Sequence, residues 1–178
     1  MNYMYSMFDY WETAANDKDV DKKYICDIES DLFAKVLQFE GKVLDIGCGV
    51  GRLMKEGWYG IDISPSMIKI AKTRVNGKFK VNDGRTIPYK DNFFDASYCV
   101  LVFQHLPFEI VESYINEAHR VTKKHFVFQF IDGNEDEPFS KHHELSKVLK
   151  TLRDKFKIVE IKSGYIHPLW TWIICEKL

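Results

Sequence analysis

Residues 43–52 read VLDIGCGVGR, a short apolar strand followed at once by a glycine-rich loop. Glycines at positions 47, 49 and 51 allow a tight turn and let a ligand approach bare backbone. The dinucleotide-binding fingerprint GxGxxG would need a glycine at position 52, where the chain has Arg52. Asp45 would also stand as a bare carboxylate beside the loop. This stretch therefore predicts a ligand site that suits a cation better than a pyrophosphate.

Strands and helices alternate along the rest of the chain. The expected strands are Lys42–Ile46, Trp58–Ile63, Phe79–Val81, Phe94–Phe103, His125–Ile131, Phe156–Ile161 and Trp170–Cys175. The expected helices are Asp19–Phe39, Arg52–Glu56, Ser64–Val75, Pro107–Val121 and Lys141–Leu152. This order predicts an α/β fold, with a doubly wound, mostly parallel seven-stranded sheet and helices on both faces. Two strands in succession at the end predict an antiparallel C-terminal edge hairpin.

Composition sets limits on the class of protein. The chain has 178 residues, 46% hydrophobic and 29% charged, with a net charge of −1, so we expect one folded domain. This charge gives no case for DNA or a membrane as partner. Four cysteines lie far apart without a CxxC pair, which indicates free thiols, no metal site and a reducing compartment: Cys26, Cys48, Cys99 and Cys175. The N-terminus lacks the pattern of a signal peptide, so we expect a cytoplasmic protein.

Ordered motifs between Lys42 and Val121 resemble one known family. Asp45 begins DIGCGVG, Asp62 lies in YGIDISPSMI, and Asp83 precedes Gly84. The runs IPYKDNFFDASYCVLVFQHL and EAHRVTKK follow in family order. Together they resemble the class I S-adenosylmethionine-dependent methyltransferases, most closely the small stand-alone type 11 members. The resemblance implies a Rossmann-like fold, with S-adenosylmethionine as cofactor and S-adenosylhomocysteine as product.

The family pattern implies a role for each acidic residue. Asp45 would compensate the methionine ammonium, Asp62 would accept the two ribose hydroxyls, and Asp83 would accept the adenine amino group. Each aspartate has a plainer alternative as a helix cap or turn former at a strand end. Further cofactor-binding positions follow from the same loops: Gly47, Cys48, Gly49, Arg52, Ile63, Met67, Gly84, Val100 and Gln104.

His105, just past the fourth strand, is the candidate catalytic residue. Methyl transfer from a sulfonium is a direct displacement, so a general base helps only if the acceptor must lose a proton. The alternative for His105 is a structural imidazole that caps the next helix. His142 and His143 are expected at a solvated helix start rather than in substrate contact.

The chain is expected to be a single domain, 1–178, with three parts. Residues 1–40 would form a helical lid or leader, 41–131 the cofactor-binding core, and 132–178 a substrate-side helix and the C-terminal hairpin. Five N-terminal aromatic residues are the lid candidates, although a segment that merely docks on the core would have the same composition: Tyr3, Tyr5, Phe8, Tyr10 and Trp11.

The lack of a DNA-methyltransferase motif limits the class of methyl acceptor. The (D/N/S)PP(Y/F) motif of amino-methylating DNA enzymes is replaced by Gln104-His105-Leu106-Pro107. We therefore expect transfer to an oxygen or nitrogen of a small molecule. Three alternatives stay open: a non-catalytic S-adenosylmethionine-binding subunit or sensor, a methyltransferase acting on protein or RNA with a partner, and a nicotinamide-dependent dehydrogenase. The oligomeric state does not follow from the sequence.

Overall fold

The computed structural model describes residues 3–17, 38–136, 140–164 and 168–178, with side chains from residue 7 onward. The expected helix Asp19–Phe39 and Cys26 fall almost wholly outside these ranges. The described residues form one seven-stranded sheet of order β3-β2-β1-β4-β5-β7-β6. Its strands are β1 (Val43–Ile46), β2 (Tyr59–Asp62), β3 (Lys78–Val81), β4 (Phe94–Cys99), β5 (Thr122–Ile131), β6 (Phe156–Ser163) and β7 (Trp170–Lys177).

The sheet has the expected mixed topology. The first five strands in chain order pair in parallel, and β7 runs antiparallel to both β5 and β6. β7 therefore inserts between β5 and the edge strand β6. The strand order reverses between β1 and β4, and in such sheets ligands bind at this point, outside the carboxyl ends of the strands. The predicted parallel sheet with an antiparallel C-terminal hairpin is confirmed.

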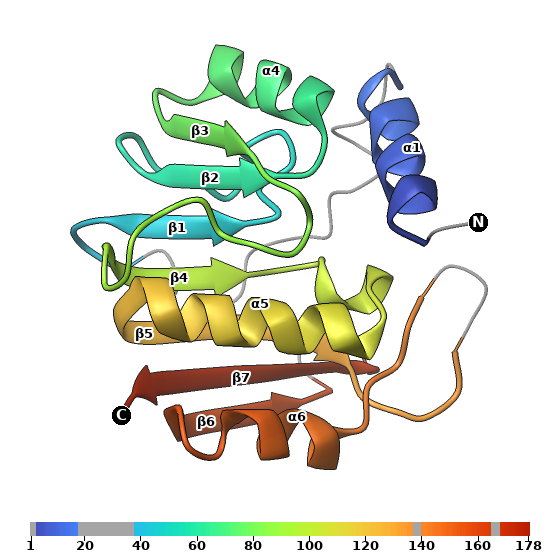
Figure 1. Cartoon of the computed structure of the whole chain (residues 1–178), viewed down its shortest axis with the longest axis vertical. Coiled ribbons are helices and arrows are strands. Elements are labelled where there is room, and N and C mark those ends of the chain that lie inside the picture. The colour runs from blue at the N-terminus through green and yellow to red at the C-terminus, as the bar shows by residue number, and fades with distance from the viewer. Residues whose placement is uncertain (1–2, 18–37, 137–139, 165–167) are drawn as a thin grey trace.

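Helices cover the two faces of this sheet (Figure 1). Helices α5 (Phe108–Val121) and α6 (Leu145–Leu152) bury one stripe each against the face that carries Leu44 and Ile46. Helix α4 (Pro65–Arg74) places Ile68 against the other face, which carries Val43. Successive β1 side chains alternate between these two layers, as the pleat of a strand requires.

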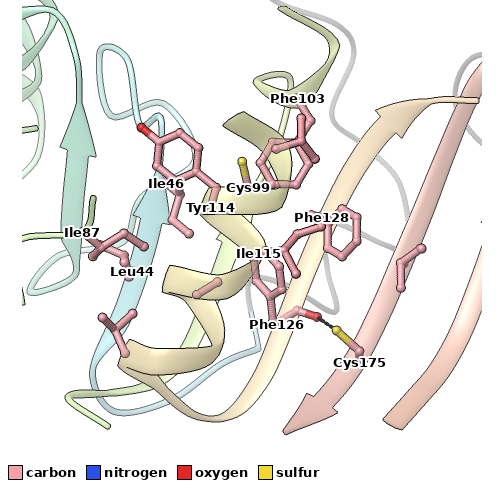
Figure 2. Close-up of a cluster of buried hydrophobic side chains, with 14 of the residues drawn as sticks. Leu44, Ile46, Ile87, Cys99, Phe103, Tyr114, Ile115, Phe126, Phe128 and Cys175 are labelled. Carbon is pink, nitrogen blue, oxygen red and sulfur yellow. Dashed lines mark hydrogen bonds between the residues drawn. The ribbon is translucent and has the colours of Figure 1, made fainter. Parts of the chain in front are cut away.

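The larger apolar core lies under α5 (Figure 2). Phe126 and Phe128 stack with ring centroids 5.0 Å apart, and both are fully buried. The Cys175 thiol donates to the carbonyl oxygen of Phe126 at 3.1 Å, across the β5–β7 pair. Each of the three cysteines that the structure describes is a free, buried thiol. Burial in these surroundings raises the pKa of Cys175, so this thiol is unreactive.

Two expected elements differ in the structure. Residues 52–56 form turns instead of a helix. Gly51 and Gly57 both have φ near +80°, so the five residues between them are too few to repay helix nucleation. The fourth strand ends at Cys99, because the amide of Leu101 donates to the Gln129 side chain instead of a neighbouring strand. A 3-10 helix, η1 (Phe103–His105), follows.

The expected solvated helix start around His142 and His143 is also wrong. His143 is buried, and its Nε2 atom lies 2.9 Å from the carbonyl oxygen of Phe103. His142 forms a parallel bridge with Ile131. The helix begins only at Leu145, whose amide donates to the carboxylate of Asp132.

Near the N-terminus, helix α1 (Tyr3–Ala15) lies beyond the carboxyl ends of β1 and β2 and beside α4 (Figure 1). Ala14 and Ala15 are buried against Val50 and Met67. Within the described part of residues 1–40, Tyr3–Ala15 are thus helical and pack at the edge of the sheet where ligands bind. Among the helices that the structure describes, none is long and apolar enough to span a membrane.

Candidate active site

A cavity of about 420 Å³ opens at the carboxyl ends of β1, β2 and β4, with α1 on its outer side. It is lined by every residue that the sequence assigned to the cofactor or to catalysis except Asp83. Segments 45–53, 62–67, 82–84 and 100–106 thus converge on one space. This size falls within the range of small-molecule and cofactor sites, about 300–1,000 Å³.

The glycine loop packs tightly against Val102 at Gly47 and is open at Gly49. Gly47 has φ +74°, and a Cβ there would lie 2.3 Å from Cγ2 of Val102. Gly49 has φ +50°, and a Cβ would meet nothing within 4 Å. The amides of Gly47 and Cys48 both donate to the carbonyl oxygen of Ile61, at 2.8 and 2.9 Å. The loop therefore offers the ligand close approach at Gly49, whereas these two amides are held within the sheet.

Asp45 is the last but one residue of β1 and is almost fully buried, beside Tyr98 on β4. Burial raises the pKa of its carboxyl to about 8. A hydrogen bond with Tyr98 opposes this rise, the charge of Asp62 adds to it, and Arg52 opposes it. A carboxyl with this pKa is mostly protonated at pH 7. A cationic group placed beside it would restore the carboxylate, so the site fits an ammonium ligand.

Asp62 ends β2 and holds the loop in place. Its Oδ2 atom accepts from the amide of Gly49 and its Oδ1 atom from the amide of Ser64, both at 2.9 Å. Burial raises the pKa of Asp62, and these two backbone hydrogen bonds oppose the rise. Each carboxylate oxygen has a second lone pair. Asp62 can therefore also accept hydroxyl groups from a ligand in the cavity.

Asp83 is placed differently from the other two aspartates. It is exposed, and its carboxylate accepts from the amides of Arg85 and Thr86 and from the Thr86 hydroxyl. Burial raises its pKa, but these hydrogen bonds together outweigh that effect and the pKa is lowered. The neighbouring residues Asn82 and Gly84 line the cavity instead. The geometry of Asp83 is that of a turn former, and its role toward an adenine ring stays a prediction.

The other end of the cavity is formed by η1 and α1. Gln104 and His105 line it, and the Nε2 atoms of the two side chains lie 3.4 Å apart. Trp11 on α1 meets the His105 ring edge to face, with centroids 5.3 Å apart. The structure therefore places an N-terminal aromatic residue beside the candidate catalytic histidine.

Sequence reasoning missed a further set of lining residues. Most are apolar and belong to the strand ends and helices around the cavity: Met7, Val50, Leu53, Asn82, Leu101, Val102, Leu106, Tyr114 and Trp170. In a single sequence their periodicity is that of core residues, so no local signal separates them. Asn82 is the exception, because it directly precedes the Asp83-Gly84 pair. Its Nδ2 atom donates to the Tyr114 hydroxyl at 2.8 Å.

The donor set of the cavity suits an organic cation rather than a metal. Within the described ranges, no group of three or more His, Cys, Asp and Glu side chains is arranged to hold a metal ion. Two buried carboxyls, Asp45 and Asp62, share the cavity with Arg52. The methionine ammonium, the ribose hydroxyls and the sulfonium of S-adenosylmethionine match these groups in charge and in hydrogen bonding.

Comparisons with known proteins point to methyltransferases. Residues 44–129 match the model of a methyltransferase domain family. An uncharacterized protein of Methanocaldococcus jannaschii is 32% identical over 130 residues, which are 71% of this chain and 51% of that protein. The 18S rRNA (guanine(1575)-N(7))-methyltransferase of Saccharomyces cerevisiae is 34% identical over 115 residues, 53% of this chain and 42% of the yeast protein. The chain thus spans about half or less of the length of these relatives.

A solved structure is similar over the whole chain. Magnesium protoporphyrin IX methyltransferase from Synechocystis PCC 6803, crystallised with S-adenosylhomocysteine, superposes with a TM-score of 0.78 at 18% identity. The match covers 99% of this chain and 100% of that one. At this identity the likeness shows the fold. Residues 44–129, which place Asp45, Gly47, Gly49 and Asp62 around one cavity, match the methyltransferase domain family, and the chain has the fold of the class I S-adenosylmethionine-dependent methyltransferases.

Proposed function

We propose that the chain transfers the methyl group of S-adenosylmethionine to an oxygen or nitrogen of a small-molecule acceptor. One observation carries this proposal: a single cavity has Asp45 and Asp62 at the glycine-loop end and His105 at the η1 end. The first pair suits the cationic cofactor, and the histidine stands where a proton acceptor is useful. Within residues 41–131, the glycine loop and the ends of β1 and β2 supply the cofactor side, and η1 together with α1 supplies the acceptor side.

The protein promotes this reaction mainly by aligning the acceptor with the methyl group and the sulfur of the cofactor. The acceptor's lone pair forms a bond to the methyl carbon, the carbon–sulfur bond breaks, and its electron pair stays on sulfur. Holding both reactants in line supplies about 7–11 kcal/mol of the barrier reduction. Asp45 and Asp62 favour the cationic cofactor already in the ground state, and such binding does not by itself lower the barrier. The alignment of the acceptor with the methyl group therefore depends on the apolar walls around His105.

His105 is proposed as the general base for acceptors that lose a proton. It lies on η1, whose backbone is closed by the His105 amide donating to the carbonyl oxygen of Val102 at 2.9 Å. The side chains of Gln104 and Trp11 contact it from two sides. A rigid imidazole on the cavity wall can accept a hydroxyl or ammonium proton without rearranging the loop. General-base catalysis of this kind contributes about 10²–10⁴-fold.

Helix α1 is proposed as the lid over this site. Glu12 connects it to the start of α4, where the hydroxyls of Ser64 and Ser66 and the amide of Ser66 donate to its carboxylate. Trp11 and Met7 then face the cavity from the next turns of the same helix. A helix with one anchored face and one face on the cavity can cover the reaction and exclude water.

The first test is calorimetric titration of wild type and Asp62→Ala with S-adenosylhomocysteine and, separately, with NADH. We expect micromolar binding of S-adenosylhomocysteine, weakened in the variant by about 1.5–3 kcal/mol, as for a lost hydrogen bond to a charged group. NADH should not bind. Thr73→Ala, an exposed change on α4, is the matched control. Binding of NADH instead would show a dehydrogenase and overturn the proposal.

A second measurement separates an enzyme from a sensor. Transfer of labelled methyl from S-adenosylmethionine is followed with pooled small-molecule extracts, with total RNA and with a protein extract. Labelled small molecules are the expected product. Labelled RNA would favour an acceptor like that of the yeast relative, and labelled protein would favour a side-chain acceptor. Tight cofactor binding with no transfer to any pool would favour a non-catalytic subunit.

A further inference from the structure

The acceptor end of the cavity carries Gln104 and His105 on a mostly apolar and aromatic wall. Beyond these two residues, the wall includes Met7, Trp11, Leu106 and Trp170. Within the described parts of the chain, the acidic and basic side chains that line the cavity besides His105 are Asp45, Asp62 and Arg52, in the glycine loop and at the ends of β1 and β2. A carboxylate or ammonium on the acceptor would therefore find no ion-pair partner among the four apolar residues, and its desolvation would cost affinity.

Trp11 and His105 give this end a definite shape. Their rings lie edge to face, 5.3 Å between centroids and 78° between planes. Two rings at nearly a right angle form a corner. A flat ring can lie against one of them and present its edge to the other, as aromatic groups prefer. An aliphatic acceptor of equal size has no flat face and gains nothing specific there.

The position of Trp11 is fixed by its neighbour. Glu12 accepts from Ser66 Oγ at 2.7 Å, from the Ser66 amide at 3.1 Å and from the Ser64 hydroxyl. Burial raises the pKa of Glu12, but these hydrogen bonds outweigh it and the pKa is lowered, so the anchor is ionised at neutral pH. The buried Ala14 and Ala15 pack on Val50 and Met67 one turn further along. Trp11 is thus placed before an acceptor arrives.

The charge of α1 distinguishes between two classes of acceptor, a free molecule and a base within a nucleic acid. Helix α1 reads YMYSMFDYWETAA, with two acids, Asp9 and Glu12, and no lysine or arginine. A phosphate backbone crossing this helix would meet negative charge, whereas nucleic-acid sites gain most of their affinity from Lys and Arg. The helix that shapes the acceptor corner therefore favours a ligand without a phosphate chain.

We propose that the methyl acceptor is a free, uncharged, planar aromatic molecule whose nucleophilic hydroxyl or ring nitrogen lies on its edge, and that Trp11 selects for this planarity. This rests on the proposed function. For a hydroxyl acceptor, the oxygen lone pair forms the new bond to methyl, its proton passes to His105, and the carbon–sulfur electron pair leaves with S-adenosylhomocysteine. A ring nitrogen needs no proton transfer.

The experiment compares two probes of matched connectivity on protein saturated with S-adenosylhomocysteine. 2-Naphthol is planar, and decahydro-2-naphthol has the same carbon skeleton and hydroxyl without the flat rings. By calorimetry we expect wild type to bind 2-naphthol about tenfold more tightly, near the upper end for an aromatic contact. Trp11→Ala should remove this preference, and Trp11→Phe should keep most of it. Asp9→Asn, an exposed change on the same helix, should leave it intact.

Other outcomes overturn the proposal. Equal affinity for the two probes would show that planarity is not selected. A Trp11→Ala variant that loses S-adenosylhomocysteine affinity but keeps the probe preference would place Trp11 over the cofactor instead. A single-stranded RNA that displaces 2-naphthol, with affinity falling steeply from 50 to 200 mM salt, would point to a nucleic acid base. In all three results the wild type still binds S-adenosylhomocysteine, whereas a wild type that fails to bind it would overturn the proposed function too.

Discussion

The side-chain amide of Gln129, fully buried on β5, donates to Oε1 of Gln104 on η1 at 3.0 Å. Its own Oε1 atom accepts from the amide of Leu101, also at 3.0 Å. Leu101 has φ +61°, a left-handed conformation that costs a non-glycine residue about 1 kcal/mol or more. One buried side chain thus holds both the turn that ends β4 and the glutamine beside His105. These two bonds fix the orientation of both side-chain amides. The Oε1 atom of Gln104 faces Gln129, so its amino group faces the imidazole of His105.

Removing either function of Gln129 should therefore act at a distance on His105. Gln129→Leu leaves the Leu101 amide unpaired and should lower the free energy of unfolding by about 1–3 kcal/mol. Gln129→Glu keeps an acceptor for Leu101 but, when ionised, loses the donor to Gln104. We expect kcat to fall in both variants while the dissociation constant for S-adenosylhomocysteine changes less than twofold. Urea denaturation and steady-state kinetics measure the two effects.

Ser97→Ala is the control for the Gln129 variants. Ser97 is buried in the neighbouring strand β4 and hydrogen-bonds Thr122, away from the cavity. The Ser97→Ala variant should have a lower free energy of unfolding but an unchanged ratio of kcat to KM. If Gln129→Glu turns over like wild type at every pH, Gln129 does not position the histidine.

His105 is tested through the pH dependence of turnover with a hydroxyl acceptor. His105→Ala should lower kcat by about 10²–10⁴-fold and leave cofactor affinity intact. His105→Gln keeps a hydrogen-bonding side chain that does not titrate, so the acidic limb of the pH–rate profile should disappear. His119→Gln on α5, against Phe156 and away from the cavity, is the matched control. Turnover of His105→Ala at the wild-type rate would show that the acceptor's proton goes to water.

Much of the site follows from local sequence, and the reasons are physical. Asp45 and Asp62 lie at the carboxyl ends of apolar strands, and a parallel sheet brings these ends to one edge. Motif spacing alone therefore places these carboxyls together. Trp11 and Trp170 are different, because they reach the cavity through helix and strand packing that no short motif encodes. Residues 141–143 were misplaced for a related reason: a bridge to Ile131 and burial of His143 override the local helical pattern.

Asp45 should make stability fall as pH rises. Its pKa in the folded chain is about 8, above the ordinary value of 3.8, so the folded state binds more protons between these limits. Stability is then fully present below pH 4 and is lost toward pH 8, by at most about 1.4 kcal/mol per pH unit. Asp45→Asn should flatten this slope in urea denaturation between pH 5 and pH 8, and exposed Asp154→Asn should not. An unchanged slope in Asp45→Asn would contradict the raised pKa.

The same carboxyl makes cofactor binding release a proton. At pH 7 Asp45 is mostly protonated in the free protein, and the methionine ammonium of S-adenosylhomocysteine would favour the carboxylate. Affinity should therefore rise from pH 6 to pH 8. Calorimetry at pH 7 in phosphate and in Tris should give different apparent enthalpies, from which the number of protons released is obtained. In Asp45→Asn the two buffers should agree, and proton release that persists there would assign it to another group, such as Asp62.

Arg120 on α5 holds the loop that leads from Gly84 to β4. Its guanidinium binds the Glu117 carboxylate through two nitrogens at 2.7 Å and the carbonyl oxygens of Ile87 and Tyr89 at 2.8 Å. The Glu117 carboxylate also accepts from the Ile87 amide, and the bond from Arg120 lowers the pKa of Glu117. Stability from Glu117 is present above its ordinary pKa and is lost as pH falls below it.

Arg120→Lys should therefore be destabilising even though it keeps the charge. A lysine offers one point charge in place of a planar fork, so it cannot donate at once to both carboxylate oxygens and both carbonyls. Because the pair is partly exposed, we expect a loss of only about 1–2 kcal/mol at pH 7, and less at pH 4. Exposed Arg153→Lys is the control and should change nothing. Urea denaturation at pH 7 and pH 4 measures the loss of unfolding free energy in Arg120→Lys. An equal loss at the two pH values would mean that Arg120 acts through the carbonyls alone.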